Sequence, residues 1–281
     1  MKKYLLGIFL ATLFLFSVAG ISLCLAQDAS EFPERIISLG PSITEQLYLL
    51  GLKDKVVGVT TYCRDSSEKE KIGTIVEVDE EKIISLKPDL VLAIPLTNPK
   101  TVKKLQNLGL RVESFELARD FQELGEQFVL LGVMVGERER AEQIVRQANF
   151  EVERIKEKVS HLPKVKVLVQ VGANPLFVAN KDSFVNDSIE FASGINVATD
   201  TRTGLYSREQ ALQDNPDVIL IISMGIEGEQ EKEVWQKYTS LKAVEDQRIY
   251  IIDDYLYCSP TPQTFVKGLE RMVEILHPED G

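Results

Sequence analysis

Histidine is scarce in this chain, with only two residues among 281. His161 and His277 stand far apart, and neither lies near another evident metal ligand in the sequence. Sites for bare zinc or manganese usually recruit several imidazoles, so we expect no metal bound directly by the protein. A Ser–His–acid catalytic set is not evident either. The sequence also lacks a Gly-rich nucleotide loop and a Gly-x-Ser-x-Gly motif, which argues against an enzyme and against a resident cofactor.

Basic residues are outnumbered by acidic ones, 32 against 43. Residues 1–26 contain two lysines and no acid, so the rest of the chain carries 30 basic against 43 acidic residues, a net charge of -13. Such a surface repels nucleic acid, and we expect no nucleic-acid partner. The acids alternate with lysines and many apolar positions, which indicates a globular chain of one large or two modest domains.

The first residues resemble an export signal. Two lysines precede a nearly wholly apolar run over 4–25, the order typical of a secretory signal. We expect a signal peptide over 1–26, with a mature chain that starts at Gln27 in the periplasm or another extracytoplasmic space. The four residues that end at Cys24 also resemble a lipoprotein box, although Leu23 fits that box badly; lipidation would tether the domain to a membrane. The run is also nearly long enough to remain as a membrane anchor.

A unit of strand, turn and helix recurs along the first half. Short apolar segments typical of buried strands alternate with segments of helical pattern. Strands alternating with helices predict a parallel sheet covered by helices on both faces. The expected strands cover 35–39, 56–59, 90–94 and 111–115, and the expected helices cover 43–50, 79–86 and 100–108.

The same pattern returns after Pro163, with expected strands over 166–171 and 218–223 and helices over 184–192 and 207–213. One phrase, helix then Pro-Asp then buried strand, occurs at Pro88-Asp89 and again at Pro216-Asp217. Proline followed by aspartate ends helices and turns the chain in many folds. Its recurrence at matching places predicts an α/β protein of two doubly wound lobes with parallel sheets.

One amphipathic stretch, Gly136 to Ser160, lies between the two halves. Its apolar residues recur at spacings of three and four, as in a helix with one buried face. About 24 residues at 1.5 Å each give roughly 36 Å, enough to cross from one lobe to the other. We therefore expect a single long interlobe helix; the alternative is a helix packed on one domain. The expected division is an amino-terminal lobe over 33–135, the helix over 136–161 and a carboxyl-terminal lobe over 162–281.

Several stretches, in this order, resemble the helical-backbone class of periplasmic binding proteins, the family that includes vitamin B12 and ferric-siderophore receptors of ABC importers. Together they cover nearly all of the chain after the signal, and they resemble the B12 receptors somewhat more. The matching stretches are Arg35 to Glu45, Val57 to Tyr62, Leu86 to Val91, Gln170 to Pro175 and Tyr206 to Glu209.

The resemblance implies a binding protein that holds its ligand in the cleft between the lobes. In open parallel sheets the loops after the strands form the crevice, which agrees with that placement. The expected ligand is a metal chelate, either a corrinoid or an iron chelate such as a siderophore or haem. The residues carried over to the cleft are Pro41, Ser42, Tyr62, Cys63, Arg64, Asn98, Asn174, Phe177, Met224, Tyr255, Tyr257 and Cys258.

Aromatic residues are the chemically telling members of that set, because flat macrocycles are gripped by amphipathic rings with few polar contacts. Plain core packing is the other role open to them. Arg64 is suited to pair with an anionic chelate, although an exposed loop arginine is usually only solvated. B12 receptors of this class tend to line the cleft with tryptophan, whereas Trp235, the sole tryptophan, stands in a charged helical stretch away from the expected cleft.

Cys63 and Cys258 fall on expected cleft loops of opposite lobes. Two cysteines in an exported chain suggest a disulfide. Such a bond would close a loop of nearly two hundred residues, worth about 5 kcal/mol, but it would also staple the lobes across the cleft. Two reduced thiols facing the ligand, or two buried thiols without a role, are the alternatives.

The family docks on its transporter through one acidic residue on each lobe. By motif match these are Glu81 and Glu209, which can meet two basic pockets of a symmetric permease dimer. Either can equally be a solvated acid favoured by a helix start. We therefore expect a monomeric substrate-binding protein of an ABC importer. The alternatives are a membrane-tethered chelate sensor or storage protein and, less well supported, an exported enzyme.

Overall fold

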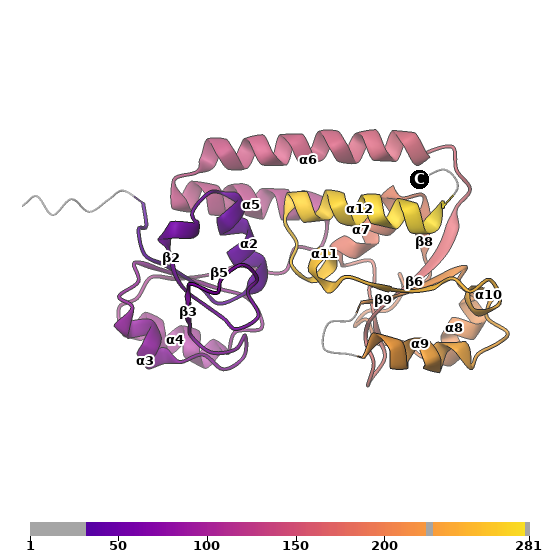
Figure 1. Cartoon of the computed structure of the whole chain (residues 1–281), viewed down its shortest axis with the longest axis horizontal. Helices are drawn as coiled ribbons and strands as arrows, with labels where there is room; N and C mark the ends of the chain where they lie inside the picture. Colours follow the sequence, from indigo (N-terminus) through magenta and orange to yellow (C-terminus); the bar gives the residue numbers. More distant parts are fainter. Residues whose placement is uncertain (1–31, 223–226, 279–281) are drawn as a thin grey trace, which may run out of the picture. The chain divides into compact units, whose positions relative to one another are not determined.

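The computed structural model describes residues 32–222 and 227–278 (Figure 1). The expected signal peptide over 1–26, the lipidation residue Cys24 and the expected cleft residue Met224 lie outside these ranges. Within the described ranges, no helix combines the length and the apolar character that crossing a membrane requires.

The first sheet belongs to the amino-terminal half, and all its neighbouring strands are parallel, in the order β3-β2-β1-β4-β5. The sequence predicted four of these strands to within one or two residues and missed β3, which has only two residues. The strands are β1 (Ile36–Ser38), β2 (Val56–Val59), β3 (Glu70–Lys71), β4 (Leu90–Ala93) and β5 (Val112–Ser114), and the connecting helices are α2 (Pro41–Leu49), the 3-10 helix η1 (Lys53–Lys55), α3 (Glu80–Ser85) and α4 (Pro99–Asn107).

The second sheet is parallel, as expected, except for one short strand that the sequence did not predict. Strands β10, β9 and β6 are parallel neighbours, and β8 runs parallel to the first residues of β6. The short strand β7 pairs antiparallel with the last residues of β6, because a loop of only four residues joins the two. The strands are β6 (Val165–Gly172), β7 (Phe177–Val178), β8 (Gly194–Asn196), β9 (Val218–Ile222) and β10 (Ile249–Ile252).

Six helices of the described residues alternate with these strands or follow the last of them. The sequence predicted α7 and α8 closely and gave no bounds for α9 to α12. They are α7 (Phe184–Phe191), α8 (Arg208–Asp214), α9 (Gly228–Gln236), α10 (Lys242–Glu245), α11 (Asp254–Cys258) and α12 (Pro262–Leu276).

Each sheet is buried on both faces. Successive residues of a strand point to opposite faces of the sheet, and here both sets of side chains enter apolar clusters. In β4, Leu90 and Leu92 enter one apolar cluster while Val91 and Ala93 enter another. In β9, Val218, Leu220 and Ile222 divide from their neighbours in the same way. These near-continuous apolar runs are typical of central strands in an α/β fold.

The repeated Pro-Asp phrase has the same structural role in both halves. Asp89, just before β4, accepts hydrogen bonds from the backbone N–H groups of Glu34 and Arg35, just before β1. Asp217, just before β9, accepts one from the N–H of Lys166 at the start of β6. Both aspartates thus satisfy backbone donors at the entry to the neighbouring strand, which explains why the phrase recurs.

Two long helices, rather than one, pack against the cores of both halves. Helix α6 (Arg138–Val159, 22 residues) gives Ala141 to the first-half cluster and Ala148, Val152, Ile155 and Val159 to the second-half cluster. Helix α5 (Phe121–Val135) does the same in the opposite direction: Phe121 and Leu124 belong to the second-half cluster, and Phe128 and Leu131 to the first. Figure 1 shows α6 running over α5 at one end and α12 at the other.

The expectation of an interlobe helix is therefore confirmed for α6, but it was incomplete because α5 bridges the cores as well. The two helices approach closely at Gly132, where an added Cβ would lie 2.5 Å from the Cβ of Ala141. Gly136 ends α5 in the left-handed region at φ 83°, a conformation that glycine adopts without strain. This tight turn sends α6 back along α5. The division at 33–135, 136–161 and 162–281 stays a prediction.

Candidate functional site

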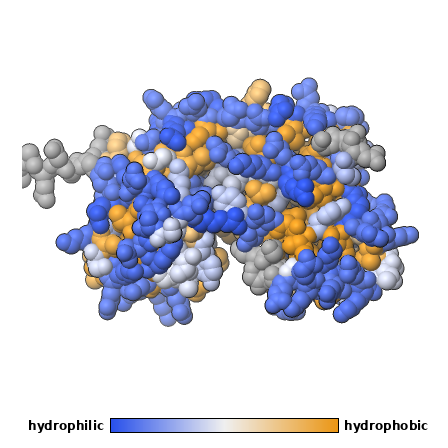
Figure 2. All heavy atoms as spheres, viewed as in Figure 1, coloured by the Kyte–Doolittle hydropathy of each residue, from blue (hydrophilic) through white to orange (hydrophobic). Residues whose placement is uncertain are grey.

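The loops after the strands of the two sheets carry the candidate site. Tyr62 follows β2 and is 64% exposed, and Leu96 follows β4 and is 57% exposed. Large apolar side chains this open to solvent are informative where they gather at strand ends. In the space-filling view the surface between the two halves is hollowed on the side away from α6 (Figure 2). The sequence predicted the ligand cleft at these strand-end loops, and that placement stays a prediction.

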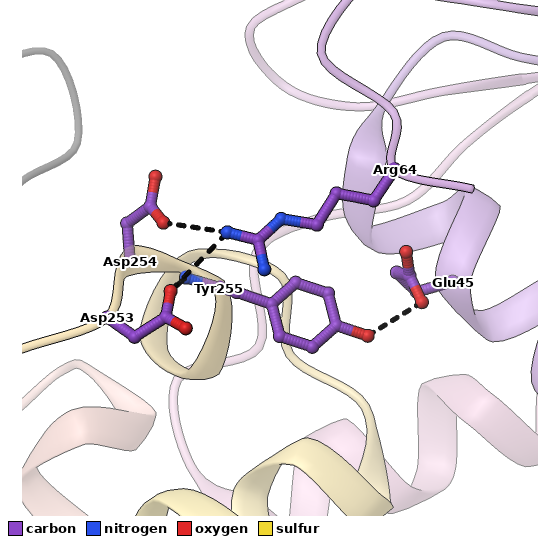
Figure 3. A network of polar contacts seen from close by, with 5 residues as sticks. All are labelled: Glu45, Arg64, Asp253, Asp254 and Tyr255. Carbon is purple, nitrogen blue, oxygen red and sulfur yellow. Dashed lines mark hydrogen bonds and ion pairs between the residues drawn. The ribbon is translucent and has the colours of Figure 1, made fainter. Parts of the chain in front are cut away.

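Arg64 links the two halves beside Tyr62. Its Nη2 lies 3.4 Å from Oδ1 of Asp253 and 3.2 Å from Oδ1 of Asp254, both just after β10 (Figure 3). The guanidinium carbon also lies 4.4 Å from the centre of the Tyr255 ring, a cation–π distance. About half of the arginine side chain is exposed, so each ion pair contributes little on its own. Arg64 is nevertheless not a free cation.

Tyr255 completes this link from the other side. Its hydroxyl donates a 2.8 Å hydrogen bond to Oε2 of Glu45 on α2 (Figure 3). Burial, and then this hydrogen bond, raise the pKa of Tyr255 to about 12, so the hydroxyl stays protonated and remains the donor. A second buried contact lies nearby, where Nε2 of Gln46 donates to the carbonyl oxygen of Pro260 at 3.2 Å. We call Glu45, Arg64, Asp253, Asp254 and Tyr255 the cross-lobe network.

The structure contradicts the prediction that Tyr257 lines the cleft. Its side chain is 4% exposed, and its hydroxyl donates a 2.7 Å hydrogen bond to the carbonyl oxygen of Gly268 on α12. The segment expected to be a loop is the short helix α11, in which residues two apart point about 200° away from each other. Tyr255 faces the other lobe, and Tyr257 therefore enters the core.

The two described thiols are free and belong to different environments. Cys63 is 7% exposed, and its Sγ lies 3.1 Å from Oγ1 of Thr44 and 3.3 Å from Oγ1 of Thr60, all within the first half. Cys258 is half-buried against the second-half core, and burial, followed by the charges of Asp254 and Asp253, raises its pKa to about 12. The structure thus lacks the Cys63–Cys258 disulfide, and Cys63 faces its own core instead of a ligand.

The remaining expected cleft residues lie on the same loops and helix starts. Pro41 and Ser42 are half-buried in the first turn of α2. Asn98 is exposed, and its side chain caps α4 by accepting a 3.0 Å hydrogen bond from the N–H of Lys100. Asn174 is exposed and Phe177 is half-buried, on the connection from β6 to β7.

The two expected docking acids occupy equivalent helical positions. Glu81 stands in the first turn of α3 and Glu209 in the first turn of α8, and both are exposed. Each helix is capped by the residue before it: Asp79 accepts from the N–H of Lys82, and Ser207 from the N–H of Gln210. Neither glutamate has an ion-pair or hydrogen-bond partner among the described residues.

A network of hydrogen bonds joins the first residue of α8 to α9 and β6. Glu231 on α9 accepts hydrogen bonds from Nη2 of Arg208 at 2.7 Å and from Nε2 of Gln170 at 2.8 Å. Oε1 of Gln170 in turn accepts one from the indole N–H of Trp235 at 2.6 Å. The sole tryptophan therefore lies buried in the second-half core on α9. Among the described residues, no group of three histidine, cysteine or acidic side chains could hold a metal ion.

Three acidic members of the cross-lobe network, and Gln46, were not predicted from the sequence. Asp253 and Asp254 immediately follow the last strand, where side chains at the carboxyl edge of a parallel sheet converge. That position was an available signal. Glu45 carried no such signal, because its role depends on the distance between two halves that are far apart in sequence.

Comparison with known proteins places the chain in a family. Residues 36–256 match the family model described as periplasmic binding protein. An uncharacterised ABC transporter substrate-binding lipoprotein of Bacillus subtilis (strain 168) is 31% identical over 260 residues, which cover 88% of this chain and 81% of that protein. A vitamin B12-binding protein of Vibrio vulnificus (strain CMCP6) is 26% identical over 249 residues, covering 86% of this chain and 89% of that protein.

Solved structures show the same fold. The crystal structure of a possible iron-binding, periplasmic solute-binding protein from Staphylococcus epidermidis superposes with a TM-score of 0.78 at 27% identity, covering 88% of this chain and 100% of that one. The chain belongs to the periplasmic binding protein family. This membership confirms the resemblance and the two-lobed α/β fold. The family consists of substrate-binding transport proteins, so the chain is not an enzyme.

Proposed function

We propose that this protein captures a metal chelate in the cleft between its lobes and delivers it to the permease dimer of an ABC importer. The chelate is a corrinoid such as vitamin B12, or an iron chelate such as a ferric siderophore or haem. We further propose that the chain is exported by its first 26 residues and acts as a monomer. The relatives named for vitamin B12 binding and for iron binding support this ligand class.

The observation that carries the proposal is the pair of exposed apolar side chains at strand ends, Tyr62 and Leu96, on the lobe whose Glu45 and Arg64 contact the other lobe. A large ligand with apolar faces buries such side chains, and each aromatic ring so covered contributes apolar area as well as ring stacking. The few polar groups around them fix the ligand's orientation.

The mechanism is capture without chemistry. Ligand binding shifts the lobes within a narrow range, because α5 and α6 both pack into the cores of the two lobes and cannot slide independently. The lobes then present the ligand to the permease, with Glu81 and Glu209 as the proposed docking points. Their helix-start positions leave both carboxylates pointing away from intramolecular partners among the described residues.

Calorimetric titration with cyanocobalamin, haemin and a ferric hydroxamate tests the ligand class. We expect one of them to bind, and Tyr62→Ala to weaken that binding by about tenfold, or 1.4 kcal/mol, within the range of one lost aromatic contact. The matched control is Phe150→Ala, because Phe150 is also 64% exposed but stands on α6. No binding of any chelate would move the proposal toward a sensor or storage role for other molecules, and equal losses in the two variants would remove Tyr62 from the site.

Uptake of the bound chelate by cells tests the docking points. We expect Glu81→Ala and Glu209→Ala each to reduce uptake while leaving the binding affinity for the chelate unchanged. The matched control is Glu139→Ala, because Glu139 is likewise an exposed acid in the first turn of a helix, α6. Normal uptake with both docking variants combined would refute their role.

A further inference from the structure

The described segments and helix starts that carry the proposed cleft residues contain more acidic than basic residues when Glu45, Asp253 and Asp254 are included. The segment over 60–71, which ends in β3, contains three acidic and three basic residues, so its formal charge is zero. The other strand-end segments expected in the cleft, 94–98 and 173–177, carry no charge. The sign is therefore set by the carboxylates that α2 and α11 add, which are Glu45, Asp253 and Asp254.

Arg64 does not offset this charge for a ligand. Its guanidinium is already compensated by Asp253 and Asp254, at 3.4 and 3.2 Å. The Tyr255 hydroxyl is committed as well, since it donates to Glu45. Arg64 uses Nη2 for both aspartates, and its other guanidinium nitrogens have no hydrogen-bond partner among the described residues. The cleft can thus offer N–H donors to neutral oxygen atoms without offering net positive charge.

The neighbouring carboxylates are close enough to act on the same groups. Besides burial and Glu45, the charge of Asp65 also raises the pKa of Tyr255, whereas Arg64 lowers it. A carboxylate at the end of an open cleft repels an anionic ligand over several ångströms, and salt weakens that repulsion.

We propose that the ligand of this cleft is a neutral or cationic chelate and that anionic chelates are selected against by the carboxylates of the cross-lobe network. This inference rests on the proposed function and narrows its ligand class. It also reverses the role expected for Arg64, which was a counter-charge for an anionic chelate. In the structure the aspartates of the opposite lobe fill that role, and the ligand meets a neutralised guanidinium.

Ligands that share one scaffold and differ in charge test the inference. Ferrioxamine B is a monocation, its N-acetyl derivative is neutral, and its N-succinyl derivative is a monoanion. Cyanocobalamin and its monocarboxylic acid form a second matched pair, neutral and anionic. We expect the anion to bind about three- to fiftyfold more weakly than its neutral parent, the range for one extra unit charge at about 7 Å between water-like and protein-surface dielectric. Raising the salt concentration should strengthen binding of the anion and weaken binding of the cation.

Two variants connect the effect to the network. Asp254→Asn removes one carboxylate and should narrow the difference between anion and neutral parent by at least threefold. Asp253 is left in place because its side chain caps α11. The matched control is Asp246→Asn, which makes the same change at an exposed position before β10, at the opposite end of that strand from Asp254. It should leave the difference unchanged.

The outcomes separate the two proposals. An anionic derivative that binds as tightly as its neutral parent, or an unchanged difference in Asp254→Asn, would overturn the charge selection while leaving chelate capture intact. If neither series nor haemin binds, chelate capture itself is refuted, and the charge selection falls with it; binding of haemin alone, which carries two carboxylates, would overturn only the charge selection. The salt dependence of binding to the unmodified protein tests the charge selection without relying on any variant.

Discussion

The close approach of α5 and α6 gives a sharp test of how the lobes are joined. Gly132→Ala would place a methyl carbon 2.5 Å from the Cβ of Ala141 and 3.1 Å from the carbonyl oxygen of Glu137. Ordinary contact needs about 1 Å more, so the helices must separate, at a cost of about 1 to 3 kcal/mol for overpacking. Alanine gains about 1 kcal/mol over glycine inside a helix. The expected net loss in the free energy of unfolding is about 0 to 2 kcal/mol.

Gly125 provides the internal control, because it lies in the same helix and undergoes the same substitution. Its added Cβ would meet only the Val145 side chain, with Cγ1 at 3.2 Å and Cγ2 at 3.9 Å, so a shift of a few tenths of an ångström relieves the contact. Gly125→Ala should therefore be neutral or stabilise by up to about 1 kcal/mol. Chemical denaturation followed by circular dichroism at 222 nm measures both changes. The two variants should differ by about 2 kcal/mol.

A compensating change isolates the contact. Ala141→Gly removes the methyl group that the new side chain would strike, so the double variant with Gly132→Ala should recover about 1 to 3 kcal/mol relative to the sum of the single changes. Equal effects of Gly132→Ala and Gly125→Ala, together with a coupling energy below about 0.3 kcal/mol, would show that the helices do not meet there. The two-helix bridge would then be wrong.

Three further predictions concern single side chains. Glu231→Ala leaves its part-buried arginine partner, Arg208, unpaired, so the free energy of unfolding should fall by up to about 3 kcal/mol. The emission of Trp235 should also shift, because Gln170, its hydrogen-bonded neighbour, loses a partner. Burial opposes ionisation of Asp217, but hydrogen bonds from Lys242 and from a backbone N–H outweigh it and lower the pKa of Asp217. Asp217→Asn should therefore lower the free energy of unfolding by about 1.5 kcal/mol at pH 7. This difference in stability between the two proteins should be lost as the pH falls below the ordinary carboxyl pKa and through the lowered pKa of the folded state. Both described thiols should react slowly with a maleimide at pH 7 in the folded protein and rapidly after unfolding, Cys63 because it is buried and Cys258 because its pKa is raised; rapid labelling of either would contradict the packing described.

Local patterns allowed much of the fold to be predicted. Apolar runs bounded by turns located the central strands, and the repeated Pro-Asp phrase located the entry to β4 and β9. The structure explains this success, because Asp89 and Asp217 interact with residues of the directly adjacent strand. Strand β3 was not predicted, because two residues are too few to show an alternating apolar pattern.

Helix α5 was missed for a different reason. Its sequence over 121–135 is apolar on most sides: Leu130 and Val133 are 54% and 44% exposed, so the apolar pattern does not mark the buried face. The amphipathic pattern of α6, by contrast, revealed its buried face directly. Sequence pattern thus identified the helix whose exposed side is mostly polar and missed the helix whose exposed side also carries apolar residues.

The resemblance named the expected cleft by its loops, and the site stays a prediction. The loops after β2, β4 and β6 follow strands that the sequence predicted, and strand ends converge in parallel sheets, whereas the segment after β10 was carried over from the resemblance alone. Which side chains face the cleft depends on local geometry: α11 turns Tyr255 toward the other lobe and Tyr257 into the core. The pairing of Arg64 with two aspartates depends on the separation of the lobes, which no local pattern encodes.

The antiparallel α5–α6 pair also decides how the polypeptide can be divided. Phe121 and Leu124 complete the core of the second half, although they precede it in the chain, and Phe128 and Leu131 of the same helix complete the core of the first. No single cut between residues 121 and 159 yields two fragments that each retain a whole interior. Either fragment expressed by itself would expose apolar side chains of α5 or α6 to solvent. The two halves should therefore fold and unfold together as one cooperative unit.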